Sequence, residues 1–373
     1  MVRFYYSDAM MGYNMGPHHP MRPIRLKRTV QLLDALGLPG KVLEIVAPEL
    51  ADPEEVAEVH DRGFVEALAA LDRGENVRGL HRYGLGTGDN PLFEGIGAAS
   101  MRYAGASIQA AQDVINAHNG GTPPVAFNIA GGLHHAHFSS AAGFCVLNDC
   151  ALAINRLRRQ FKRVAYVDID VHHGDGVQEL FYTDPSVLTL SIHEFAHHFF
   201  PGTGDVTEIG SGDGEGASVN IPVAPYTGDD AWIMAWREAA LPILKAFKPE
   251  AIVLQLGADP HALDPLAHAC LTAQGWLTAV QDIAALGLPT VAVGGGGYCL
   301  TTVSRMWALA VGVLTGTSLP DAVPETCPLA SEMPFLLDHE EPDVPDYLTE
   351  EADAYATQTV ELVRNRFSEF YRL

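Results

Sequence analysis

The sequence predicts an α/β fold in which helices cover both faces of a parallel β-sheet. Three observations support this fold class. The candidate strands are short and apolar along their whole length, as strands are when both faces of a sheet are buried. From about residue 125 these strands alternate with segments whose apolar residues recur at helical spacing. Polar residues follow directly after several strands, among them His193 after the strand expected at 187–192, and open parallel sheets gather functional groups at the rim beyond those carboxyl ends.

The N-terminal third contains two candidate strands and three candidate helices. We expect the strands at residues 3–7 and 41–48, and the helices within 22–40, 52–71 and 93–118. The first helix stops at Gly-Leu-Pro-Gly, because glycine and proline end helices. The second opens with Asp-Pro-Glu-Glu, whose proline and carboxylates favour a helix N-terminus.

The remaining two thirds alternate regularly between strands and helices. Strands are expected at residues 125–129, 163–168, 187–192, 217–222, 251–256 and 289–293. Helices are expected near 149–160, 175–182, 229–246, 273–285 and 300–315, with a long loop at 194–216. The acidic, proline-broken segment 338–353 is expected to be a surface excursion before a last helix that ends at Leu373. Because no linker with a change of composition divides the chain, we expect residues 1–373 to form a single domain.

Composition indicates a folded globular protein, and charge disfavours nucleic acid and anionic membranes as partners. The 373 residues are 47% hydrophobic and 18% charged, without low-complexity tracts, as in folded globular proteins. The 23 basic and 46 acidic residues give a formal net charge of −23, which repels nucleic-acid phosphate and anionic membranes. A lysine-bearing peptide or a polyamine suits this field better than a nucleotide, although solubility alone explains the charge equally well.

The cysteines and the N-terminus indicate a cytoplasmic protein. The five cysteines are scattered and show no CxxC spacing, which favours free thiols over a disulfide framework or a thiolate metal site. The N-terminal residues lack the apolar core of a secretory signal, and no apolar run reaches the roughly 18 residues of a membrane span. We therefore expect a cytoplasmic location and no membrane partner.

The stretch VAYVDIDVHHGDGV, residues 164–177, carries the densest chemistry in the chain. It begins as a buried strand and continues into five polar residues, Asp168, Asp170, His172, His173 and Asp175. These groups would repel one another and resist desolvation unless a cation lay among them, and a divalent metal is the simplest candidate. Side chains two apart on an extended chain share a face, so Asp168, Asp170 and His172 could point the same way. A polar strand end hydrogen-bonded to neighbouring loops is the alternative.

A third candidate ligand, Asp259, follows the strand expected at 251–256. With Asp170 and His172 it would make a metal set of two carboxylates and one imidazole. Such a set suits zinc with open positions for water and substrate, and iron(II), cobalt or manganese would also fit. Taken alone, Asp259 could equally be a helix N-cap or turn residue.

The motif AGGLHHAH supplies two adjacent imidazoles, His134 and His135. They could serve as a base and an acid if each has a different partner, and Asp168 and Asp175, left over from the metal set, could each orient one. Two such dyads beside a metal-bound water form a hydrolase arrangement: a histidine deprotonates the water, the metal and a donor stabilise the oxyanion, and a protonated group releases an amine. Without the other motifs, HHAH could be a plain metal-binding or surface patch.

Tyr298, in VAVGGGGYCL, follows the strand expected at 289–293. The glycines could let its hydroxyl reach the metal. They could instead cradle a phosphate, but the run lacks the Lys-Ser/Thr of a P-loop and does not match GxGxxG. A half-buried tyrosine in a turn is the remaining interpretation.

The motifs HPMRPIRL, AGGLHHAH, GFCVLND, DIDVHHGDGVQ, FFPGTGD, LGAD and GGGGY occur in this order, and the resemblance that they carry covers roughly residues 5–315. In this combination the sequence resembles the zinc-dependent histone deacetylase superfamily, and is most similar to the bacterial acetoin-utilisation deacetylases and to class I enzymes. The resemblance implies the arginase/deacetylase fold, a three-layer α/β/α sandwich around a parallel sheet of about eight strands. It also implies that the protein removes acetyl groups from protein lysines, for example in a metabolic enzyme such as acetyl-CoA synthetase.

The same resemblance assigns roles to individual residues. It implies zinc at Asp170, His172 and Asp259, catalysis by His134 and His135 with Asp168 and Asp175 as partners, and polarisation of the acetyl carbonyl by Tyr298. The implied substrate-binding residues are Gly143, Phe144, Phe200 and Leu266 in the walls of an acetyl-lysine tunnel, with Asp89 at its rim. Arg25 matches the arginine of an internal acetate channel. A structural potassium ion is implied at Asp168 and Ser191 and at the backbone carbonyls of Asp170, His172 and Ile192.

Parts of the chain depart from the family pattern. After Asp259 the sequence is PHALDPLAH, where eukaryotic class I enzymes carry a different loop, and the last 50 or so residues show no family signature. His173 receives no role and is expected to be a buried hydrogen-bonding residue.

Three other functions compete with protein deacetylation. An acetylpolyamine amidohydrolase is the main alternative, although the HPMRPIRL loop favours peptide. An arginase-like binuclear manganese hydrolase needs additional aspartates where LGADPHA supplies one. If the protein were a catalytically silent module that binds acetylated tails, we would expect a metal ligand or Tyr298 to be missing. The three candidate ligands and Tyr298 are all present.

Overall fold

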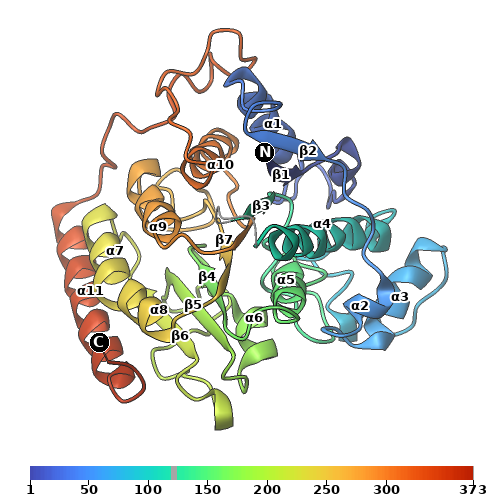
Figure 1. Ribbon diagram of the computed structural model, residues 1–373, viewed down its shortest axis with the longest axis horizontal. Coiled ribbons are helices and arrows are strands. Elements are labelled where there is room, and N and C mark those ends of the chain that lie inside the picture. Colours follow the sequence, from blue (N-terminus) through green and yellow to red (C-terminus); the bar gives the residue numbers. More distant parts are fainter. Residues whose placement is uncertain (119–123, 373) are drawn as a thin grey trace.

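An eight-stranded, fully parallel sheet forms the centre of the protein and carries helices on both faces (Figure 1). The structure is a computed structural model and describes residues 1–118 and 124–372. The strands are β1 (Val2–Tyr5), β2 (Leu43–Val46), β3 (Val125–Asn128), β4 (Val164–Asp168), β5 (Val187–Glu194), β6 (Ser218–Val223), β7 (Ala251–Gln255) and β8 (Thr290–Val293). Their order across the sheet is β2-β1-β3-β8-β7-β4-β5-β6. The predicted three-layer α/β sandwich with a parallel sheet of about eight strands is therefore confirmed.

Two helical layers enclose this sheet. The helices are α1 (Ile24–Ala35), α2 (Pro53–Val56), α3 (Arg62–Asp72), α4 (Ile96–Ala117), α5 (Asp149–Leu157), α6 (Asp175–Phe181), α7 (Asp229–Ala235), α8 (Leu241–Phe247), α9 (Ala273–Ala285), α10 (Leu300–Leu314) and α11 (Asp346–Phe367). Helices α1, α9 and α10 pack together on one face, and α4 packs with α5 on the other (Figure 1). In the described part of the chain no helix is both long and apolar enough to span a bilayer, although α4 and α11 each have 22 residues.

The helix expected at residues 52–71 is instead two helices, α2 and α3. The carboxylate of Asp61 accepts the N–H of Phe64 at 3.0 Å and caps the start of α3. The Asp61 backbone is not helical, and residues 57–61 separate the two helices. The single-helix prediction was therefore wrong, because an internal capping residue was taken for an ordinary helical position.

Two further boundaries differ from the expectation. Strand β5 runs to Glu194, the residue at which the long loop was expected to begin. Helix α11 begins at Asp346, inside the segment expected to be a surface excursion, and ends at Phe367. The expected helix end, Leu373, lies outside the described residues.

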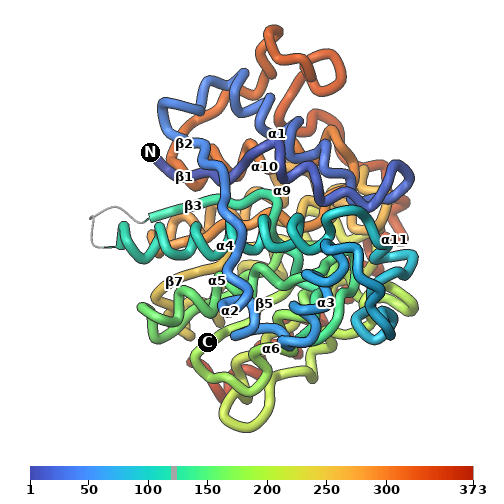
Figure 2. Tube along the Cα trace, turned by 90° about the vertical axis from the view of Figure 1, so that its right-hand side faces the viewer, coloured from blue at the N-terminus to red at the C-terminus, as the bar shows by residue number. Residues whose placement is uncertain are grey.

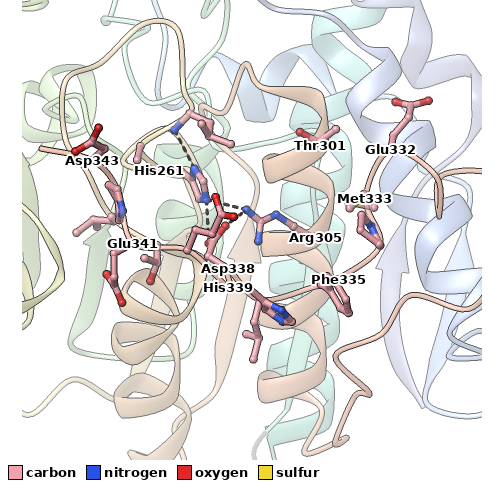
Figure 3. A pocket seen from close by; sticks show the side chains of 18 residues that line it. His261, Thr301, Arg305, Glu332, Met333, Phe335, Asp338, His339, Glu341 and Asp343 are labelled. Carbon is pink, nitrogen blue, oxygen red and sulfur yellow. Dashed lines mark hydrogen bonds and ion pairs between the residues drawn. The ribbon is translucent and has the colours of Figure 1, made fainter.

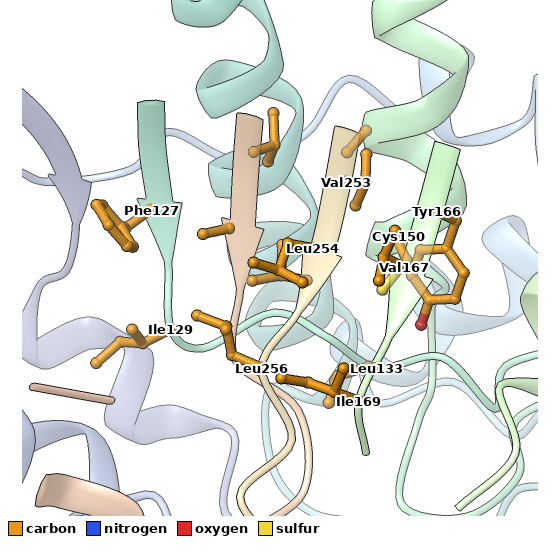
Figure 4. Packing of buried hydrophobic residues seen from close by; sticks show 14 of the residues in the cluster. Phe127, Ile129, Leu133, Cys150, Tyr166, Val167, Ile169, Val253, Leu254 and Leu256 are labelled. Carbon is orange, nitrogen blue, oxygen red and sulfur yellow. The ribbon is translucent and has the colours of Figure 1, made fainter. Parts of the chain in front are cut away.

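The middle strands are buried on both faces, which explains their continuous apolar runs. Every residue of β4 and of β7 is buried. Figure 4 shows the side chains of β3, β7 and β4 packed beside Cys150 of α5, with Phe127, Leu254 and Val167 in one layer. Close packing of this kind resists displacement, so the strand ends form a rigid base for the loops that follow them.

The segment between α10 and α11 crosses back over the N-terminal part of the chain. Figures 1 and 2 show it beside α1, although about 300 residues separate the two in sequence. The guanidinium of Arg28 in α1 donates to the carboxylate of Glu332 at 2.9 Å. The part of the chain without a recognisable family motif is thus anchored to the fold.

Candidate metal and catalytic site

Asp170, His172 and Asp259 lie together at the carboxyl end of the sheet. Their potential ligand atoms all lie within 4.8 Å of one another, and all three residues are buried. The first two follow β4 and the third follows β7, and these strands are neighbours in register, with Asp168 opposite Gln255. Adjacent parallel strands bring their carboxyl ends to the same edge, which explains why residues about 90 positions apart meet here.

Neighbouring donors fix the orientation of the two carboxylates. The Gln255 amide and the Gly296 N–H donate to Asp170 at 2.7 and 2.8 Å, and the Val171 N–H donates to Asp259 at 2.9 Å. The His172 Nδ1 atom lies 3.2 Å from an oxygen of Asp170 and 3.1 Å from one of Asp259. The cluster therefore presents three preoriented donors to one point.

The electrostatics of this cluster fit a divalent cation. Burial raises the pKa of Asp259, and the negative charge of Asp170 raises it further. Burial also opposes ionisation of Asp170, but His134 and His172 hold its pKa well below the usual range. In the metal-free protein, Asp170 thus carries a negative charge, whereas Asp259 tends to hold a proton. A divalent cation would allow both to ionise, and oxygen and nitrogen donors without thiolate match several such ions.

The glycine run before Tyr298 lets the backbone pass close to these carboxylates. A Cβ atom on Gly296 would lie 1.9 Å from the Asp259 Oδ2 atom, so only glycine fits. The Gly296 N–H already donates to Asp170, which occupies one of the amides that a phosphate would need. The glycines thus accommodate the carboxylate cluster, and the phosphate-cradle interpretation finds no support here.

His134 and His135 each have a carboxylate partner, as the sequence suggested. The His134 Nδ1 atom lies 2.7 Å from Asp168, and the His135 Nδ1 atom lies 2.7 Å from Asp175. The two Nε2 atoms are 2.9 Å apart, a hydrogen-bond distance. With each Nδ1–H donating to its carboxylate, one Nε2 must also carry a proton to donate while the other accepts, so one ring is protonated and the other neutral.

Their surroundings separate the two histidines in basicity. Burial opposes protonation of His134, but Asp168 and Asp170 raise its pKa to about 9 in the metal-free protein. Burial and the positive charge of His134 lower the pKa of His135 to about 4. A nearby cation would lower both values, yet the difference in carboxylate contacts would persist. Such a pair can hold one proton and accept another.

The loop that carries the histidine pair is held by Asn148 and Asp149 at the start of α5. The Asn148 amide donates to the carbonyls of His134 and Ala136 at 3.1 and 2.9 Å. The Asp149 carboxylate accepts the N–H groups of Gly132 and Leu133 at 3.0 and 2.9 Å. Neither residue was assigned a role from the sequence. Their signal is the Asn-Asp pair of GFCVLND, because such side chains at a helix start bond readily to backbone groups.

A buried histidine, His60, forms hydrogen bonds with the same loop and with the start of α5. Its Nδ1 atom lies 3.0 Å from the His137 carbonyl, and its Nε2 atom accepts the Asn148 N–H at 2.9 Å. The Nδ1–H donates in the first contact, and the lone pair that Nε2 uses in the second exists only in the neutral ring. Burial accordingly lowers the pKa of His60 to about 4.

We expect His60 to make the fold less stable in mild acid. The unfolded chain binds a proton near the ordinary histidine pKa of 6.5, whereas the folded chain does so only near 4. Stability is therefore lost as the pH falls through this window, by about 2 kcal/mol between pH 7 and pH 5. Urea unfolding at both pH values should show a smaller loss in His60→Gln. Equal losses of unfolding free energy in the wild type and His60→Gln would contradict this role of His60. Acid-sensitive groups elsewhere affect both proteins alike and so cancel in the comparison.

The predicted tunnel residues surround one cavity of about 210 Å³. Its lining comprises Asp89, His135, Gly143, Phe144, His172, Phe200, Leu266 and Tyr298. A Cβ atom on Gly143 would lie 2.5 Å from the His135 ring and 2.8 Å from the Phe200 ring, so the wall can approach the imidazole only at glycine. The structure thus brings an apolar wall, a metal-ligand candidate, a histidine of the pair and the tyrosine to the same space.

Tyr298 contributes a neutral hydroxyl to this cavity. Burial raises its pKa well above the ordinary value, and the charges of Asp259 and Asp170 raise it further. The hydroxyl therefore keeps its proton and can donate it in a hydrogen bond. The rings of Tyr298 and Phe144 form an edge-to-face pair, with 5.8 Å between the ring centroids.

The remaining predicted residues lie around this centre. Arg25 is buried, donates to the carbonyls of Gly295 and Gly297 at 2.7 and 3.2 Å, and lines a separate internal cavity of about 20 Å³. Ser191 of β5 lies directly opposite Asp168 of β4, with Ile192 next to it. The residues expected at the acetate channel and the potassium site are therefore close to the histidine pair and the carboxylates.

Two other histidines are structural. His193, which was expected at the rim after a strand, instead lies within β5 and is buried, with its ring nitrogens 2.9 Å from the Ser191 hydroxyl and 3.0 Å from the Gly204 carbonyl. His173 is buried, and its ring nitrogens lie 2.8 Å from the Thr203 hydroxyl and 3.2 Å from the Gln178 amide oxygen. The expected hydrogen-bonding role of His173 is confirmed, whereas the rim position of His193 was wrong.

A larger cavity of about 580 Å³ lies on the other side of the loop that follows Asp259 (Figure 3). Arg305 forms an ion pair with Asp338 there, and its guanidinium lies 2.9 Å from the His261 Nε2 atom. None of the residues assigned to metal binding or catalysis lines this cavity. Size alone therefore does not identify the reactive cavity.

Comparison with known proteins gives a consistent result. The family model for the histone deacetylase domain matches residues 19–314. Histone deacetylase 9 of Arabidopsis thaliana is 39% identical over 327 residues, which cover 87% of this chain and 75% of that protein. Histone deacetylase clr6 of Schizosaccharomyces pombe is 37% identical over 326 residues, covering 87% of this chain and 79% of that protein. Human histone deacetylase 1 is 36% identical over 326 residues, covering 87% of this chain and 66% of that protein.

Proposed function

Because the chain belongs to the histone deacetylase family, we propose that it is a metal-dependent amidohydrolase that removes acetyl groups from lysine side chains of proteins. The observation that carries this proposal is the cavity of about 210 Å³, in which His135, His172 and Tyr298 meet an apolar wall. A neutral acetyl-lysine side chain suits such a wall, whereas the charged lysine product does not. The relatives are longer than the region that matches this chain. The substrate and partners of this chain are therefore proposals.

Asp170, His172 and Asp259 would hold the metal. When bound, a divalent cation supplies Lewis-acid polarisation of the amide carbonyl and lowers the pKa of a water molecule. Zinc is our first choice, and iron(II), cobalt and manganese remain compatible with the same donors. The hydrogen bonds from Gln255 and Gly296 would keep the Asp170 oxygens turned toward the ion.

The histidine pair would manage the protons of the reaction. We propose that its neutral member accepts a proton from the attacking water and that its protonated member gives one to the departing lysine amine. Asp168 and Asp175 would orient the two rings through the contacts at 2.7 Å. Tyr298 would donate a hydrogen bond to the carbonyl oxygen as negative charge develops on it.

Other residues would guide substrate and product. Gly143, Phe144, Phe200 and Leu266 would line the path of the lysine chain, and Asp89 at the mouth would grip the substrate backbone. Arg25 would serve an internal acetate exit beside its small cavity. A potassium ion at Asp168, Ser191 and the carbonyls of Asp170, His172 and Ile192 would stabilise this edge of the sheet.

We further propose that residues 1–373 fold as one cytoplasmic domain. The net charge of −23 favours an acetylated protein with basic residues around the modified lysine over nucleic acid or a membrane. Acetyl-CoA synthetase is one candidate substrate. The same acidic field would also attract an acetylated polyamine, so an acetylpolyamine amidohydrolase is the second candidate function.

A substrate panel on the purified protein would separate these functions. We expect hydrolysis of acetyl-lysine peptides at a higher kcat/KM than of acetylspermidine, acetylputrescine or longer acyl-lysines, with one catalytic divalent ion per chain. Metal content should be measured on the same sample. Faster turnover of acetylpolyamines would favour the second candidate. Release of urea from arginine, with two manganese ions per chain, would contradict both.

A further inference from the structure

The segment from Asp259 to Thr272 has neither helix nor strand, yet it forms the wall between the two cavities. Its Leu266 lines the smaller, reactive cavity, and its Leu263 lines the larger one. Carboxylates from other segments hold its far end: Glu194 accepts the His268 N–H at 2.9 Å, and Asp229 accepts the Thr272 N–H at 2.9 Å. In the middle of the segment, the carboxylate of Asp264 accepts backbone N–H groups from this segment and from the loop of Tyr298.

Asp264 is buried and accepts three backbone N–H groups. Its Oδ1 atom accepts the N–H of Leu266 at 3.1 Å. Its Oδ2 atom accepts the N–H of Tyr298 at 2.7 Å and, more weakly, that of Cys299 at 3.4 Å. One carboxylate thus joins the backbone of the tunnel wall to the backbone of the tyrosine, although the two belong to different loops.

The backbone around Tyr298 needs such an anchor. Gly295 and Gly297 before it have φ values of +126° and +122°, a region that only glycine adopts freely, so the run itself restrains the tyrosine little. Cys299, at the N-cap of α10, makes no capping hydrogen bond with its side chain. The Asp264 carboxylate instead accepts the N–H of this N-cap residue and places negative charge near the start of a 15-residue helix, where it is favourable.

We propose that Asp264 is a positioning residue that fixes the tyrosine hydroxyl relative to the tunnel wall. It does not line the cavity and therefore acts through Tyr298 and Leu266. The proposal rests on the proposed deacetylase function and adds a determinant of its rate and of its substrate fit.

Asparagine at this position should separate the two contacts. An amide has one oxygen and one NH₂ group, so it can accept on one side only. Two N–H groups face Oδ2 and one faces Oδ1, so the amide oxygen should turn toward Tyr298 and Cys299. The NH₂ group then opposes the Leu266 N–H, and that side of the wall loosens.

The test compares Asp264→Asn and Asp264→Ala on an acetyl-lysine peptide with the metal-loaded enzyme. Because a displacement of about 1 Å can cost about 100-fold in rate, Asp264→Ala should lower kcat about 10- to 100-fold. Asp264→Asn should keep kcat within about 3-fold of wild type and raise KM about 5-fold. In a Tyr298→Phe background, Asp264→Ala should lower kcat less than about 2-fold further, since both changes act through one hydroxyl.

Asp229→Asn is the matched control, because Asp229 is a carboxylate that accepts the N–H and hydroxyl of Thr272 at the far end of the same segment. It should lower the melting temperature without changing kcat or KM. Equal losses of kcat in Asp264→Asn and Asp264→Ala, or additive losses with Tyr298→Phe, would overturn the proposal. If Asp264→Ala does not fold, Asp264→Asn alone tests the proposal. A raised KM with retained kcat would support it, and an unchanged KM would overturn it.

A binding measurement distinguishes failure of this proposal from failure of the proposed function. If the wild-type protein hydrolyses no acetyl-lysine peptide, the proposed function fails. A linear alkyl hydroxamate that fills the cavity should still bind Asp264→Asn at least about 5-fold more weakly than wild type, because the Leu266 wall has moved. Equal affinities would overturn the role of Asp264 irrespective of catalysis.

Discussion

Replacing Tyr298 with phenylalanine is expected to lower kcat for an acetyl-lysine peptide by about 100- to 1,000-fold, with little change in KM. The loss corresponds to removal of one oxyanion donor from a site shielded from water. Tyr298 lines the reactive cavity, and burial raises the pKa of its hydroxyl well above the ordinary value, so the hydroxyl is a neutral donor across the working pH range. Its hydrogen bond strengthens as charge develops on the carbonyl oxygen, which is why kcat rather than KM should respond.

The phenylalanine ring should keep the contacts of the tyrosine ring. The edge contact with Phe144 involves only the ring, so the apolar wall of the cavity should survive the change. Metal content and melting temperature should therefore match those of the wild type. Tyr371→Phe is the control, because it removes another tyrosine hydroxyl, one that donates to the Gly216 carbonyl at 2.9 Å, without touching the cavity. Deacetylation by Tyr298→Phe at the wild-type rate would contradict the proposed mechanism.

The position of the site could be predicted from the sequence because its residues follow buried strands. Asp170 and Asp259 come directly after β4 and β7, and a parallel sheet places these ends at one edge. The same rule failed for His193, because β5 continues past the expected end and keeps this side chain inside the sheet. Strand ends are therefore good guides to a region, while the exact residue at the edge depends on how far each ladder extends.

The tunnel could be expected only through the family resemblance. Asp89, Gly143, Phe200 and Leu266 belong to four loops far apart in the sequence, and none of these loops shows a pattern that points to the others. Loop geometry depends on tertiary contacts, whereas periodicity reports only on local structure. The fold had to be known before these residues could be seen as one wall.

The supporting residues escaped sequence analysis for a different reason. Asp264 and Asn148 bond to backbone groups of other segments, and such contacts leave no trace in local spacing. Gln255 offered a signal, because it is a polar residue at the end of a strand that is buried throughout and apolar up to that point. A buried polar residue needs a partner, and here the partner is the carboxylate of Asp170 at 2.7 Å.

Removal of the proposed metal should abolish hydrolysis and lower the melting temperature of the wild type, whereas Asp259→Asn should abolish hydrolysis without destabilising the metal-free fold. A ligand present at 100 times its Kd stabilises a protein by about 2.7 kcal/mol, and this contribution disappears on chelation. Adding zinc, iron(II), cobalt or manganese separately to the chelated wild type should restore both activity and stability. The ion that does so at the lowest concentration identifies the preferred metal.

The stability of the metal-free proteins carries the sharper test. Burial and the charge of Asp170 raise the pKa of Asp259, so the folded metal-free protein holds a proton that the unfolded chain releases near the ordinary value. The stability linked to this proton is present at low pH and is lost as the pH rises toward the folded-state pKa. Asparagine cannot ionise, so metal-free Asp259→Asn should lack this loss between pH 5 and pH 8.

At pH 8, metal-free Asp259→Asn should therefore melt at or above the temperature of metal-free wild type, while the metal-loaded wild type melts above both. Asp230→Asn, which changes an exposed carboxylate, should follow the wild type in every condition. A metal-free Asp259→Asn that melts far below metal-free wild type would show that Asp259 chiefly supports the fold, through its bond with the Val171 N–H. The order expected here instead requires that two carboxylates crowd one buried point and that a cation relieves the repulsion between them.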